Sequence, residues 1–145
     1  MAASGKPSAL IKPTLDTRFY IDYAWWERSE GDLNIYMLSH LLPEQRESLS
    51  QATERRLIDH IDPDTGEVFQ FDELALAIRL AAADPNFISP QTSLVDSIFR
   101  VFLANDNLPL TPRELAAQTG RDANTILKTL GGVRIYKGIR PYIPD

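Results

Sequence analysis

Residues 110–132 constrain the fold most, because they contain the start and stop signals of two consecutive short helices. Thr111 is a good N-cap, Pro112 suits the first helical position, and Glu114 completes a capping box three residues after the cap. Gly120 supplies the positive φ angle that ends such a helix and turns the chain. The sequence therefore predicts a helix that begins at Pro112 and stops at Gly120.

Two more helices are predicted beside this one. Asp122 caps a helix that follows at once, and Gly131 and Gly132 stop it. Its inward face consists of three apolar residues: Ile126, Leu127 and Leu130. Residues 92–105 form a helix before both, because five apolar side chains recur there at helical spacing. These are Leu94, Val95, Ile98, Val101 and Phe102.

The three segments resemble the winged helix-turn-helix superfamily over the C-terminal third of the chain. Small Ala116 stands where the two helices of such motifs touch, and Gly120 occupies the turn. Leu115 and Ile126 are the apolar positions that pack the two helices against each other. The resemblance implies a three-helix core in which residues 92–105 form the first helix.

The resemblance also implies a wing over residues 133–142. Its strands would be Val-Arg-Ile-Tyr and Ile-Arg-Pro-Tyr, joined across Lys137 and Gly138, where glycine supplies the backbone angle of a tight hairpin. Pro141 is tolerable in the last strand only at a sheet edge, which is where a wing strand lies.

Charge and side-chain chemistry favour double-stranded DNA as the partner of this motif. Residues 107–145 hold six Lys and Arg against three Asp and Glu, whereas the first 106 residues hold nine against seventeen. The outward positions of the second helix, its entrance and the wing carry groups that reach phosphates or base edges. The candidate DNA-binding residues are Arg121, Asn124, Thr125, Lys128, Arg134, Lys137 and Arg140. A winged helix also serves as a protein-docking module, so an adaptor subunit of a larger assembly is the alternative.

Composition limits the other possibilities. The chain has 145 residues, 43% of them hydrophobic, and it contains no cysteine, which excludes disulfides, thiolate metal sites and cysteine nucleophiles. No apolar run approaches membrane-spanning length and the N-terminus lacks the hydrophobic core of a secretion signal, so we expect a cytoplasmic protein that does not contact a membrane. His40 and His60 stand far apart without a nucleophile pattern. We therefore expect no enzyme activity, no cofactor and no metal site.

Residues 18–26 concentrate five aromatic side chains, first with strand character and then in a turn or helix. Three roles remain open for them: core packing, contact with a protein partner, and stacking of bases. The candidate partner-binding residues, for a protein partner or a homodimer, are Tyr20, Tyr23, Trp25 and Trp26.

The middle of the chain predicts alternating helices and strands. Asp32 caps a helix with Leu33, Tyr36, Met37 and Leu41 on its apolar side, near His40, and Pro43 begins a polar surface helix. Residues 57–71 form a β-hairpin around a turn at residues 63–66; its acidic residues lack the spacing of a calcium loop. Asp72 then caps a helix over residues 73–83. Its buried face is Leu74, Ala75, Ile78 and Ala82.

The predicted fold class is thus α+β and mainly helical. An N-terminal arm covers residues 1–15, a mixed domain with the β-hairpin covers residues 16–89, and the winged helix-turn-helix covers residues 90–145. The predicted function is that of a non-enzymatic DNA-binding protein, a transcriptional regulator or a DNA-binding component of a bacterial-type system.

Overall fold

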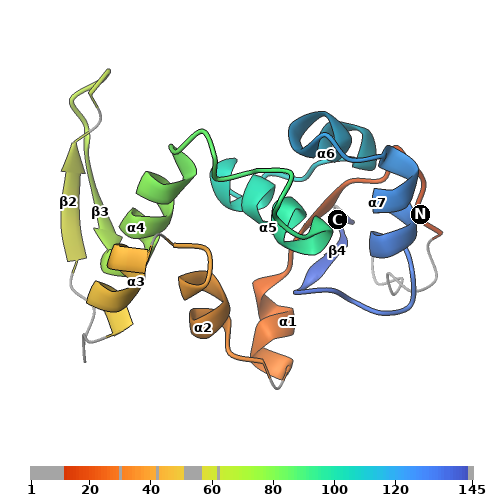
Figure 1. Ribbon diagram of the computed structural model, residues 1–145, viewed down its shortest axis with the longest axis horizontal. Coiled ribbons are helices and arrows are strands. Elements are labelled where there is room, and N and C mark those ends of the chain that lie inside the picture. Colours follow the sequence, from red (N-terminus) through yellow and green to blue (C-terminus); the bar gives the residue numbers. More distant parts are fainter. Residues whose placement is uncertain (1–11, 30, 42, 51–56, 62, 144–145) are drawn as a thin grey trace. The chain divides into compact units, whose positions relative to one another are not determined.

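The computed structural model describes five stretches of the chain: residues 12–29, 31–41, 43–50, 57–61 and 63–143. The chain forms two compact units, which we describe separately. The terminal unit combines Met1–Gly31 with Ile88–Asp145, and the central unit is Asp32–Phe87. Helices dominate both units in the described residues, and the strands are paired antiparallel, in agreement with the predicted mainly helical α+β class (Figure 1).

The terminal unit contains the three helices predicted near the C-terminus: α5 (Leu94–Ala104), α6 (Pro112–Thr119) and α7 (Ala123–Leu130). Local signals define α6 as predicted, because the Thr111 side chain accepts a hydrogen bond from the Glu114 N–H and the Glu114 side chain accepts one from the Thr111 N–H. Gly120 ends this helix in the left-handed conformation, with φ of 72°. The Asp122 carboxylate caps α7, which stops at the predicted glycine pair.

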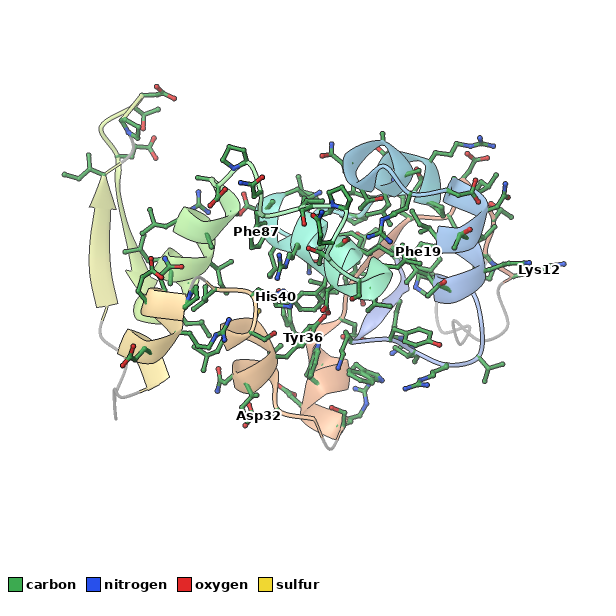
Figure 2. All side chains as sticks on the ribbon, viewed as in Figure 1. Lys12, Phe19, Asp32, Tyr36, His40 and Phe87 are labelled. Atoms are coloured by element: carbon green, nitrogen blue, oxygen red, sulfur yellow. The ribbon has the colours of Figure 1, made fainter. Side chains whose placement is uncertain are left out.

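Apolar side chains of α5, α6 and α7 meet those of the N-terminal segment in one core. Leu115 and Ile126 are fully buried, as the predicted helix pair requires, whereas Ala116 is half-buried. Phe19, from residues far away in sequence, is also fully buried in this unit, where Figure 2 labels it. Because a fully buried phenylalanine removes a large apolar area from water, residues 19–21 are part of this core.

A strand from the N-terminal part of the chain is hydrogen-bonded along both of its edges in the terminal unit. Strand β1 (Phe19–Ile21) pairs antiparallel with β4 (Ile139–Pro141), with Tyr20 opposite Arg140. On its other edge, Phe19 exchanges two backbone hydrogen bonds with Leu110, which precedes α6. The Asn107 side chain then accepts from the Ile21 N–H and donates to the Ile21 carbonyl. Both edges of β1 are therefore hydrogen-bonded by the C-terminal part of the chain.

The predicted wing hairpin is wrong, although its turn is present. Lys137 and Gly138 have φ of 54° and 77°, and the Ile139 N–H donates to the Tyr136 carbonyl, so a tight turn forms across these two residues, as predicted. Residues 133–136 nevertheless form no strand, and β4 pairs with β1 instead. In such a hairpin residues 134 and 141 form the next hydrogen-bonded pair, and Pro141 cannot donate one of its two bonds.

Helix α1 (Tyr23–Arg28) follows β1 and belongs to the same unit. The Asp22 carboxylate caps it by accepting from the Ala24 N–H. The aromatic-rich segment thus forms a strand and then a helix, as its sequence predicts. The sequence-based division placed residues 16–31 in the N-terminal domain, whereas the structure packs them with the C-terminal helices because β1 and β4 share a sheet.

The central unit contains a β-hairpin and three helices. Strands β2 (Leu57–Ile61) and β3 (Val68–Asp72) pair antiparallel, with Ile61 opposite Val68, which confirms the predicted hairpin. Helix α4 (Glu73–Ala82) lies beside them (Figure 1). Helices α2 (Leu33–Leu38) and α3 (Pro43–Ser50) pack against α4.

The buried face of α4 differs in part from the prediction. Leu74 and Ile78 are buried as expected, but Ala77 and Ala81 complete the buried face while Ala75 and Ala82 are only half-buried. The cap of α2 was predicted correctly, since the Asp32 carboxylate accepts from the Ile35 N–H. The predicted arm at residues 1–15 and the end of the predicted polar helix lie largely outside the described residues.

Candidate nucleic-acid interface

The outer face of α7 presents three of the predicted DNA-binding side chains. Asn124, Thr125 and Lys128 are exposed, while Ile126 and Leu130 on the opposite face are buried. Residues three and four positions apart lie on the same side of a helix, so the three exposed side chains form one surface. The Thr125 hydroxyl donates to the Asp122 carboxylate at 3.1 Å, which leaves Asn124 and Lys128 as the groups on this surface for which the structure shows no internal hydrogen bond.

A cationic loop follows α7. We call residues 131–138 the basic loop; it contains Arg134 and Lys137, both exposed. The Arg134 guanidinium lies 4.9 Å from the centre of the Tyr136 ring, within the range of a cation–π contact. Val133 is fully exposed at 104%. The basic loop thus places two cations and an apolar side chain in solvent directly after α7.

Two predicted DNA-binding arginines form hydrogen bonds or an ion pair inside the terminal unit. The Arg121 guanidinium donates to the carbonyls of Pro90 and Thr92 and so ties the segment before α5 to the start of α7. The Arg140 guanidinium forms an ion pair with the Asp22 carboxylate at 3.0 Å, and both side chains are largely buried. Such charge-assisted bonds would have to break before either arginine contacted a phosphate.

The predicted partner-binding aromatics divide between core and surface. Trp26 is 6% exposed, and its ring packs edge-to-face on Phe99, so it is a core residue and not part of a docking surface. Tyr23 is exposed, and Tyr20 and Trp25 are half-buried. Burial, and then the Asp22 carboxylate, raise the pKa of Tyr20 above its ordinary value of 10.0. Burial also raises the pKa of Tyr23.

The sequence-based reasoning missed one cation that lies near the basic loop. Pro13 packs against Gly131, since a Cβ built on that glycine would lie 3.5 Å from the proline ring. Lys12 precedes this contact, and its exposed side chain points away from the ribbon (Figure 2). No pattern in the sequence joins Lys12 to the end of α7, because the contact is made by residues more than a hundred positions apart.

The two units differ strongly in net charge. Over its bounds the terminal unit has eleven Lys and Arg against nine Asp and Glu, a net charge of +2. The central unit has four against eleven, a net charge of −7, and the two values add up to the −5 of the whole chain. Electrostatic attraction to a polyanion would therefore act on the terminal unit.

Features typical of other kinds of site are few in the described part of the chain. His40 is buried in the central unit, in edge-to-face contact with Tyr36 (Figure 2). Among the described residues no three His, Cys, Asp or Glu side chains are grouped as metal ligands would be. None of the described helices is both long and apolar enough to cross a membrane.

The chain matches no family model, no curated protein and no solved structure. Within the terminal unit, the exposed face of α7 and the basic loop form the candidate interface.

Proposed function

We propose that the protein is a non-enzymatic double-stranded DNA-binding protein, acting as a transcriptional regulator or as the DNA-binding component of a larger system. In this proposal α5, α6 and α7 act as a helix-turn-helix of the winged type, whose wing is reduced to the turn at residues 136–139. Helix α7 enters the major groove, where Asn124 contacts base edges. The basic loop and Lys128 contact phosphates.

The observation that carries the proposal is the exposed polar face of α7, continued by a cationic loop on the unit with net positive charge. The capped helix pair with its left-handed Gly120 turn supports it, because this geometry fixes one helix relative to the next. Four cations contribute to the proposed phosphate contacts. They are Lys12, Lys128, Arg134 and Lys137.

The test is the salt dependence of binding to a 20-base-pair duplex, measured by fluorescence anisotropy between 50 and 200 mM salt. Each phosphate neutralised contributes about −0.9 to the slope of log affinity against log salt, so three or four contacts give a slope of about −3 to −4. Replacing Lys128, Arg134 and Lys137 together by Ala should reduce this slope by about two to three. Arg140→Gln, which removes a cation already paired with Asp22, is the matched control and should change the slope by less than about 0.5.

Sequence reading is tested separately with Asn124→Ala. If the Asn124 amide reads a base edge, this variant should lose about 1–3 kcal/mol of discrimination between preferred and random duplexes and keep its affinity for random DNA. An equal loss on both would assign Asn124 to the backbone. Absence of binding by the parent protein at 50 mM salt would overturn the DNA proposal.

A protein-docking adaptor is the second candidate, and one observation favours it. Four large hydrophobic side chains of the terminal unit are exposed: Tyr23 at 38%, Leu108 at 62%, Val133 at 104% and Tyr142 at 42%. Sedimentation equilibrium tests the homodimer form of this alternative. Self-association that disappears in Val133→Glu, in a protein that binds no duplex DNA, would establish it.

A further inference from the structure

Helix α1 and its N-cap residue are hydrogen-bonded to the backbone at the end of the basic loop. The Trp26 indole N–H donates to the Lys137 carbonyl at 3.1 Å, across 111 positions of sequence. The Asp22 N–H donates to the Gly138 carbonyl at 2.8 Å, directly beside it. Trp26 is 6% exposed and Gly138 is buried, so the two bonds connect buried residues to the end of an exposed loop. Helix α1 and its cap therefore fix the backbone at the end of the basic loop.

The backbone that α1 holds has an unusual conformation. Lys137 is one of three residues other than glycine in the described chain with positive φ, and Gly138 follows it with φ of 77°. A Cβ on Gly138 would lie 2.9 Å from the Trp26 indole nitrogen and 3.1 Å from the Asp22 carbonyl oxygen. Lysine rarely adopts the left-handed region, so surrounding contacts are needed to keep Lys137 in it.

Trp26 is itself fixed on its other side. Its ring packs edge-to-face on Phe99, a fully buried residue of α5, at 6.4 Å between ring centres. The indole thus connects the core of the terminal unit to the Lys137 carbonyl. A hydrogen-bond donor on a rigid support sets the position of the group that accepts from it.

We propose that Trp26 is a positioning residue for phosphate recognition: through its indole N–H it fixes the turn from which Lys137 and Arg134 contact the DNA backbone. The proposal rests on the proposed function and assigns α1, a segment distant in sequence from the helix pair, to the DNA-contacting apparatus. Preorganised cations bind better than mobile ones because less side-chain and loop freedom is lost on binding.

The first test is a double-mutant cycle measured by anisotropy at 50 mM salt. Trp26→Phe keeps an aromatic ring but removes the N–H, and it should weaken duplex binding about three- to tenfold, the range expected for one hydrogen bond to a carbonyl. In a background in which Arg134 and Lys137 are both replaced by Ala, the same change should cost less than about twofold, because both cations that it positions are gone. Trp25→Phe, on the neighbouring half-buried ring, is the matched control and should change affinity less than about twofold. An equal loss in both backgrounds would make Trp26 a general stabilising residue and overturn the proposal.

The second test does not depend on DNA. Trypsin cleaves after Arg134 and Lys137, so release of the turn should accelerate cleavage there by at least about fivefold in Trp26→Phe relative to Trp25→Phe, without equal acceleration after Lys128. Replacing Trp26 by 3-benzothienylalanine, which has the same shape and no N–H, gives the same readout if the phenylalanine variant folds poorly. Faster cleavage of Trp26→Phe, in a protein that binds no DNA, would show that Trp26 holds the turn but would overturn the proposed DNA-binding function. Unchanged cleavage would overturn the positioning role even if the parent protein binds DNA.

Discussion

Gly138 offers the sharpest test of the contact between α1 and the basic loop. In Gly138→Ala the new methyl group would meet the Trp26 indole nitrogen at 2.9 Å and the Asp22 carbonyl oxygen at 3.1 Å, both closer than a Cβ normally approaches. An L-residue at φ of 77° also costs about 1–2 kcal/mol, and overpacking adds about 1–3 kcal/mol. We therefore expect a loss of about 2–5 kcal/mol in the free energy of unfolding.

Gly120→Ala is the matched control, because it separates backbone strain from the close contact. Gly120 has nearly the same φ, 72°, but a Cβ there would meet nothing within 4 Å. Strain alone predicts a loss of about 1–2 kcal/mol for this variant. Urea denaturation followed by tryptophan fluorescence measures both variants in the terminal unit, since Trp25 and Trp26 lie there. Losses equal within about 0.5 kcal/mol would refute the close approach of Gly138 to Trp26.

Three further variants test individual interactions. Arg121→Met removes the bonds to the Pro90 and Thr92 carbonyls and should lower the free energy of unfolding in urea by about 1–3 kcal/mol. The slope of log DNA affinity against log salt should change by less than about 0.5. A larger change of slope would mean that Arg121 contacts a phosphate. Thr111→Ala removes the cap of α6 and should lower the free energy of unfolding by about 0.5–2 kcal/mol, whereas no loss would contradict the capping box. Since the pKa of Tyr20 is raised in the folded protein, its contribution to stability is full below pH 10 and is lost as the pH rises through the folded value. Tyr20→Phe should therefore show a smaller fall in Tm from pH 8 to pH 11 than the parent, and an identical fall would exclude Tyr20 as a cause.

Local signals in the sequence predicted the helices of the terminal unit well. The caps at Thr111 and Asp122 act within three residues, and the left-handed conformation of Gly120 is a property of that residue and its neighbours. Interactions of this range depend little on the rest of the chain, so they can be predicted before the fold is known.

The partner of β4 could not be predicted in the same way. Its pairing with β1 joins residues about 120 positions apart, and no pattern in either segment indicates the other as its partner. The turn at Lys137 and Gly138 favours two paired strands, whereas Pro141 cannot donate one of the two bonds that residues 134 and 141 would exchange, and β4 pairs with β1 instead. A donor count along the last strand would have shown this.

The candidate site was predicted in part for the same reason. Exposure of Asn124 and Lys128 follows from the helical period of α7, which the sequence displays. The internal bonds of Arg121 and Arg140 depend on segments brought together by the fold, as does the nearness of Lys12 to the end of α7. Charge alone does not distinguish a cation in solvent from one that holds two segments together.

The outer edge of β4 also has a consequence for the behaviour of the protein at high concentration. Gly138, Arg140 and Tyr142 direct their backbone groups toward β1, so only Ile139 and Pro141 face the other way. The Ile139 N–H is already bonded to Tyr136 and Pro141 has none, which leaves this edge with carbonyl acceptors and no donor. A strand of another molecule cannot complete a ladder on such an edge, so the lack of a backbone donor protects it against edge-to-edge pairing.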